Sequence, residues 1–100
     1  MNTALDSVLS KAENALDTLH AVSEALSAIR VTRRSDDAPV TVTVDGSGAL
    51  TDLELAPDLS RESAPRLANA IVVTASEAAR EALERHVSIL AQMQSSLSET

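Results

Sequence analysis

The residues able to carry out chemistry are few in this sequence, and they lie far apart along it. His20 and His86 are the only imidazoles, each among apolar or ordinarily charged neighbours. A metal centre or a catalytic pair would need both to converge, so a half-buried or interfacial side chain is the simpler interpretation of His86. Because the chain has no cysteine, thiolate zinc sites and thiol nucleophiles are excluded. We therefore expect no enzyme, no metal and no cofactor.

The segment Asp45-Gly46-Ser47-Gly48 has the glycines of a phosphate-binding loop but not its context. No Lys-Ser or Lys-Thr follows it, and it joins two segments of strand-like alternation instead of opening a helix. The acidic residues nearby match no calcium-loop spacing; they are Asp36, Asp37, Asp45, Asp52 and Asp58. Both features are typical of solvated turns without a ligand.

Arg30, Arg33 and Arg34 form the densest basic cluster, and two interpretations of it remain open. They could contact nucleic acid, or they could be the charges that protect an edge strand from aggregation. The formal net charge of -7 repels phosphate on average. The absence of Phe, Tyr and Trp removes any stacking platform for single strands. Duplex DNA contacted through its phosphates remains compatible with the sequence.

Two long helices are predicted from the apolar periodicity. The first covers residues 3–27, with a coiled-coil-like stripe made by Leu5, Leu9, Ala12, Leu16, Leu19 and Leu26. The second covers residues 63–97, with Ser60 and Ser63 as candidate caps and Pro65 in the first turn. Its middle is rich in Ala and Ser, which permits close approach of another element.

Between the helices, alternation predicts three strands at about 28–34, 40–45 and 49–55. Val40, Val42 and Val44 alternate with threonines, and Gly46 and Gly48 supply the turn to the third strand. There we expect Leu53 and Leu55 to point inward.

One hundred residues make a single domain, 1–100, with a thin core that lacks aromatic side chains. A helix of 25 residues is about 37 Å long, whereas a six-residue strand covers only about 20 Å. Both helices must therefore overhang the sheet, and their apolar stripes continue into the overhangs. We predict a homodimer whose interface includes Leu5, Leu9, Leu16, Leu90, Met93 and Leu97.

The hairpin VTVTVDGSGALTDLELAP at 40–57 carries a family resemblance, as do RLANAIVVTASEAAREA at 66–82 and IRVTRRSD at 29–36. Together they resemble the YbaB/EbfC family of bacterial nucleoid-associated proteins over nearly the whole chain. The resemblance implies an α+β fold of α-β-β-β-α order, a three-stranded antiparallel sheet flanked by two long helices, in a tweezer-like homodimer. It also implies DNA contacts near the helical arms, where this chain has Lys11, Arg80 and Arg85. This chain departs from the family in its acidic, leucine-rich first helix and in having Arg33 and Arg34 where many members have glycines.

The preferred function is that of a cytoplasmic, non-enzymatic, nucleoid-associated dimer that binds duplex DNA with low sequence specificity. The residues predicted to contact DNA are Lys11, Arg33, Arg34, Arg80 and Arg85. The alternative is a protein-interaction adaptor on the same fold, such as a secretion-system accessory, that binds a protein partner and no DNA. Since the longest apolar run is four residues, 70–73, no membrane association is expected.

Overall fold

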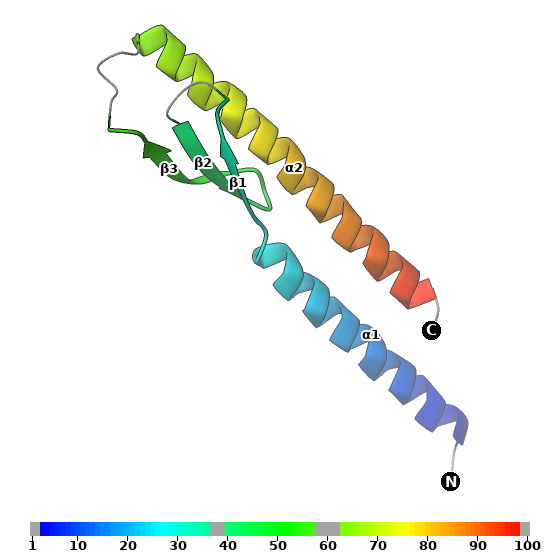
Figure 1. Cartoon of the computed structure of the whole chain (residues 1–100). Helices are drawn as coiled ribbons and strands as arrows, with labels where there is room; N and C mark the ends of the chain where they lie inside the picture. The colour runs from blue at the N-terminus through cyan, green and yellow to red at the C-terminus, as the bar shows by residue number, and fades with distance from the viewer. Residues whose placement is uncertain (1–2, 37–39, 58–62, 99–100) are drawn as a thin grey trace.

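One long helix precedes a three-stranded sheet along the chain and a second follows it, the order predicted from the sequence, which confirms the α-β-β-β-α fold (Figure 1). The computed structural model describes residues 3–36, 40–57 and 63–98. The elements are α1 (Thr3–Ser27), β1 (Arg30–Arg34), β2 (Val40–Asp45), β3 (Leu50–Leu55) and α2 (Ala64–Ser98).

The first strand begins later than predicted because the residues before it close the first helix. Ala28 donates its backbone N–H to the Glu24 carbonyl at 3.0 Å, and Ile29 donates to the Leu26 carbonyl at 3.3 Å. These bonds satisfy carbonyl groups in the last turn of α1, so β1 starts only at Arg30. At the start of α2, the Ser63 hydroxyl accepts a hydrogen bond from the Arg66 backbone N–H at 3.3 Å, as a cap does. Ser60, the other predicted cap, lies outside the described residues.

The sheet is antiparallel in the order β1-β2-β3, with β2 in the centre. Strand alternation places Val40, Val42 and Val44 on one face, where all three are completely buried. Val31 of β1 pairs with Val44 and is buried beside it. An irregularity between Thr43 and Val44 shifts the pairing with β3.

The second helix packs on β1 and β2 (Figure 1). Its buried residues are Thr74, Ala78 and Ala82, spaced one turn apart on a single side. Because these side chains are small, the helix backbone comes close to the valines of β2. The predicted role of the Ala-rich middle of this helix is therefore the one found.

The third strand lies beyond the edge of α2, so its leucines are not buried. Leu53 pairs with Val42 and Leu55 with Val40, which puts both leucines on the core face, as predicted. They are nevertheless 37% and 38% exposed, because α2 covers the face only over β1 and β2. The prediction that these leucines point inward is confirmed, but in the single chain α2 leaves them uncovered.

The first helix extends away from the sheet and runs antiparallel to the distal part of α2, which it contacts (Figure 1). No residue of α1 is fully buried. The molecule measures 77 × 18 × 14 Å and has a radius of gyration of 20.7 Å, against about 13 Å for a compact domain of this length. The single chain is thus extended: the sheet and α2 form a body, and α1 forms an arm.

Candidate nucleic-acid interface

The arginines of β1 are divided between the two faces of the sheet. Arg33 pairs with Val42 of β2 and lies on the face that α2 covers, whereas Arg34 pairs with Thr41 on the opposite face. Since β1 is an edge strand, the two side chains flank the free edge of the sheet from both sides. This strand is the most basic element of the described structure, with three arginines in five residues.

On the α2 side, carboxylates of α2 surround the arginines. The Arg33 guanidinium lies 3.3 Å from the Glu77 carboxylate, with the two side chains 42% and 49% exposed. At such exposure an ion pair contributes roughly 0–1 kcal/mol and is screened by salt. Arg80 shares this charged depression, which is lined by Arg33, Glu77, Arg80, Glu81 and Glu84.

Two further arginines have structural contacts. Arg85 donates from Nη1 to the Arg30 carbonyl at 3.1 Å and lies 3.7 Å from the Glu81 carboxylate. Arg30 donates from Nη1 to the carbonyls of Ile29 and Ser27, at 2.6 and 3.2 Å. Arg85 thus fixes β1 to α2, and Arg30 helps to close the end of α1.

Lys11 is separated from the other predicted contacts. It lies on α1, about 24 Å along the helix from Ser27, and shares that helix with Asp6, Glu13, Asp17 and Glu24. The structure therefore brings Arg33 and Arg80 together, with Arg34 on the other side of the same edge and Arg85 tied to β1, but it does not bring Lys11 to them. The ion pairs of these arginines with the glutamates of α2 were not predicted from the sequence. The spacing of four residues could have indicated the pair of Glu81 with Arg85, but no local pattern indicates the pair of Glu77 with Arg33.

Within the described residues, Arg34 and Arg80 have no hydrogen bond or ion pair to their guanidinium groups. Both side chains are exposed. They are consequently the arginines that an external anion reaches without displacing a carboxylate.

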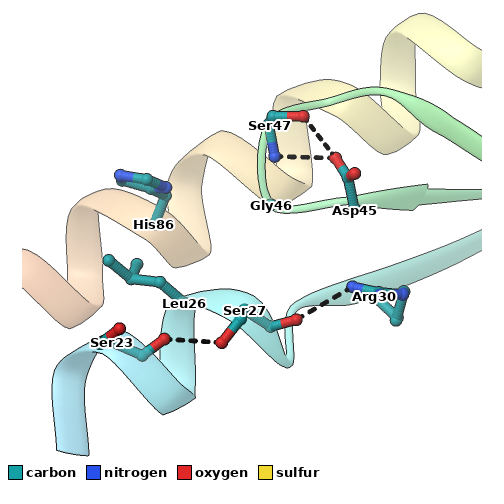
Figure 2. Close-up of a pocket in the computed structure, with 8 residues that line it drawn as sticks. All are labelled: Ser23, Leu26, Ser27, Arg30, Asp45, Gly46, Ser47 and His86. Carbon is teal, nitrogen blue, oxygen red and sulfur yellow. Dashed lines mark hydrogen bonds between the residues drawn. The ribbon is translucent and has the colours of Figure 1, made fainter. Parts of the chain in front are cut away.

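A cleft of about 440 Å³ separates the end of α1, the β2–β3 turn and α2 (Figure 2). Leu26 and His86 line it from the two helices, and His86 is half-buried, as the sequence predicted. The Ser27 hydroxyl bonds to the Ser23 carbonyl at 2.7 Å. The polar side chains around the cleft make hydrogen bonds to neighbouring groups of the same chain. The cleft lies where α1 meets the β2–β3 turn and α2.

The β2–β3 turn has its own hydrogen-bond network (Figure 2). Asp45 Oδ1 accepts from the Ser47 backbone N–H at 2.9 Å, the Ser47 hydroxyl at 2.6 Å and the Ala49 backbone N–H at 3.1 Å. These bonds, the one from the Ser47 hydroxyl foremost, lower the pKa of Asp45 below its ordinary value of 3.8. Gly48 takes a φ of 83°, a left-handed conformation that favours glycine.

In residues 3–36, 40–57 and 63–98, no three His, Cys, Asp or Glu side chains are grouped so as to hold a metal ion. Asp37 and Asp58, which belong to the acidic set considered above, lie outside those ranges. Neither α1 nor α2 contains a stretch both long and apolar enough to cross a bilayer.

The apolar residues predicted at a dimer interface lie on the two helices. Leu5, Leu9, Leu16 and Leu90 are exposed, and Met93 and Leu97 are half-buried. Further exposed apolar residues, absent from that prediction, lie on β3 and on α2, namely Leu50, Leu53, Leu55, Val72 and Leu83.

Comparison with known proteins gives one clear match. No curated protein matches the sequence. The family match covers residues 1–97, and the family it identifies is a non-enzymatic, DNA-binding one. On this match, together with the α-β-β-β-α fold, the chain belongs to the YbaB/EbfC DNA-binding family.

Proposed function

We propose that this protein is a nucleoid-associated homodimer that binds duplex DNA through phosphate contacts, with low sequence specificity. It would act on the chromosome in the cytoplasm of a bacterial cell. The single observation that carries the proposal, beside family membership, is the cluster of arginines along the free edge of β1, Arg33, Arg34 and Arg80.

The charge distribution supports the β1 edge over α1 as the contact surface. β1, β2, β3 and α2 together carry six arginines and six carboxylates, whereas α1 carries one lysine against four carboxylates. Arginine is well suited to bidentate phosphate contact. We therefore assign the main contacts to Arg34 and Arg80, and assign Arg33 a contact that requires release from Glu77. Arg85 contributes less because it bonds to Arg30, and Lys11 is too distant.

The exposed area supports association of two chains. The accessible surface is 7056 Å², compared with about 5,400 Å² for a compact monomer of this mass. The excess of about 1,600 Å² is larger than the roughly 800 Å² that each partner contributes to a standard interface. Exposed leucines of β3 and exposed Val72 and Leu83 of α2 offer apolar side chains for this association, as do Leu90, Met93 and Leu97 in the distal part of α2.

Salt dependence tests the DNA proposal. A dimer that uses Arg34 and Arg80 offers four phosphate contacts, so the logarithm of the affinity should fall against the logarithm of the salt concentration with a slope of about -3.6. Anisotropy of a labelled duplex, titrated between about 50 and 200 mM salt, measures this slope. Release of Arg33 from Glu77 would steepen it to about -5.4.

Arg34→Glu with Arg80→Glu should abolish duplex binding at low salt. The matched control is Lys11→Glu with Arg66→Glu, which changes the net charge equally and should weaken binding far less. If the two double variants lose affinity equally, the β1 edge is not the contact surface. If the unaltered protein binds no duplex at about 50 mM salt, this member does not bind DNA in this way.

Sedimentation equilibrium at micromolar concentration tests the dimer. We expect about twice the chain mass of 10.5 kDa. Leu53→Lys with Leu55→Lys should shift the population toward monomer, because two charges would enter the apolar contact. A folded monomer in the unaltered protein would contradict the proposed assembly.

A further inference from the structure

The first helix carries an exposed apolar stripe that its own chain leaves uncovered. The leucine stripe consists of Leu9, Ala12, Leu16 and Leu19, spaced 3-4-3 and so on one side of the helix. The three leucines are 52%, 54% and 48% exposed. A stripe of this spacing fits a second helix packed lengthwise.

The contact between α1 and α2 uses a neighbouring side of α1. The half-buried residues of α1 are Ala15, Thr18, Val22 and Leu26, whose spacing places them on a side next to the leucine stripe. Because α2 occupies that side, the chain's own second helix does not cover the stripe.

An acidic row borders the stripe on its other side. The row consists of Asp6, Glu13, Asp17 and Glu24, which helical spacing places together on the flank remote from Ala15 and Val22. In the described part of the chain, no ion pair joins any of these carboxylates to a basic side chain. The stripe and the row together form an apolar and anionic surface along α1.

The charge of this surface disfavours a second copy of the protein as its occupant. Two copies of α1 packed stripe to stripe in antiparallel order would bring the acidic rows together, and like charges repel. A parallel order would set each row against the flank that contains Ala15 and Val22, which α2 already occupies and where Lys11 is the one basic side chain of α1. The partner copy's distal α2 would not neutralise the row either, since residues 87–98 contain no charged side chain.

From this complementarity we infer that α1 docks an amphipathic helix of another protein, with a leucine-type apolar stripe flanked by lysines or arginines. Such a helix would cover the leucine stripe and pair with the acidic row, a helix-to-helix mode of recognition. This surface is separate from Arg34 and Arg80, so its test is independent of DNA binding.

The probe is a synthetic helical peptide of about 21 residues, or six turns, with leucines at 3-4 spacing and lysines on one flank. A matched peptide has glutamates in place of those lysines. Anisotropy with the full-length protein should show binding of the lysine peptide and at least tenfold weaker binding of the glutamate peptide. Leu9→Gln with Leu16→Gln, which keeps helix propensity, should weaken the lysine peptide about tenfold or more.

Charge reversal separates docking from general attraction. Glu13→Lys with Asp17→Lys should reverse the preference, so that the glutamate peptide binds better than the lysine peptide. The control Asp52→Lys with Glu54→Lys makes the same charge change on β3 and should leave the preference unchanged.

Three results would overturn the inference: equal effects of the two charge variants, unchanged affinity in the Leu9 and Leu16 variant, or conversion of that variant from dimer to monomer in sedimentation. The last result would mean that a second copy covers the leucine stripe.

Discussion

The body and the arm of this molecule differ in how deeply their apolar side chains are buried and in their net charge. In the body, β2 presents three completely buried valines to the small residues of α2, so packing fixes the structure. In the arm, α1 has no buried residue and keeps its leucines half-exposed beside carboxylates. The body is also neutral over its helix and strands, whereas the arm has an excess of three negative charges.

The difference supports the two separate contact surfaces proposed above. A neutral body repels phosphate less than the acidic arm does, and the arginines at its edge attract phosphate. An acidic arm repels phosphate, so its apolar stripe is better suited to a protein helix. The fold is that of a DNA-binding family. In this member the arginines lie at the β1 edge, whereas α1 is acidic.

Replacing one apolar residue by aspartate in the body and one in the arm should give the largest difference in the free energy of unfolding. Val42→Asp should unfold the protein or reduce its stability by several kcal/mol, because it buries an unpaired carboxylate. Leu9→Asp, on the exposed stripe, should cost less than about 0.5 kcal/mol. Urea unfolding followed by circular dichroism measures both. Comparable losses would show that α1 is as tightly packed as the sheet.

The turn that touches the body and the arm gives a smaller effect. Gly48 has a φ of 83°, and a Cβ there would lie 3.3 Å from the Ala79 Cβ. Gly48→Ala should therefore cost about 1–2 kcal/mol and lower the melting temperature by roughly 4–16 °C. Ala49→Gly, next to it, is the control for a change of the same size without this strain. An unchanged melting temperature for Gly48→Ala would mean that the turn adapts freely.

Local pattern predicted most of the body and less of the site. Valine alternation and the glycine turn predicted β2 and its hairpin, since strand period and turn chemistry depend on neighbouring residues. The two-residue alternation of the third strand also predicted the correct face for Leu53, but it could not show that α2 leaves β3 uncovered. The pairing of Arg33 with Glu77 joins residues 44 positions apart, and such a contact depends on how the helix lies over the sheet.

The ion pair of Arg33 with Glu77 allows the effect of a charge at the β1 edge to be compared with the effect of net charge alone. Glu77→Gln should strengthen duplex binding about threefold, because it frees Arg33 and removes one carboxylate from the β1 edge. Glu13→Gln on α1 removes the same charge far from that edge and should change binding by less. The two affinities are measured by anisotropy at one salt concentration. Equal gains would mean that only net charge matters and that body and arm do not differ toward DNA.

The smallest effect concerns acid and the β2–β3 turn. Hydrogen bonds from Ser47 and Ala49 lower the pKa of Asp45 in the folded state below 3.8. A carboxyl group with a lowered folded pKa contributes stability above its unfolded pKa, and that contribution is lost as the pH falls through the folded value. The amides of Ser47 and Ala49 should therefore report, in NMR spectra, a titration whose midpoint lies below 3.8. Ser47→Ala removes the largest cause of the shift, so it should raise the pKa of Asp45 toward its ordinary value while the residues of α1 keep their spectra. If Asp45 titrates at or above 3.8 in the unaltered protein, the hydrogen bonds of this turn do not persist in solution, and the joint between body and arm is looser than its geometry indicates.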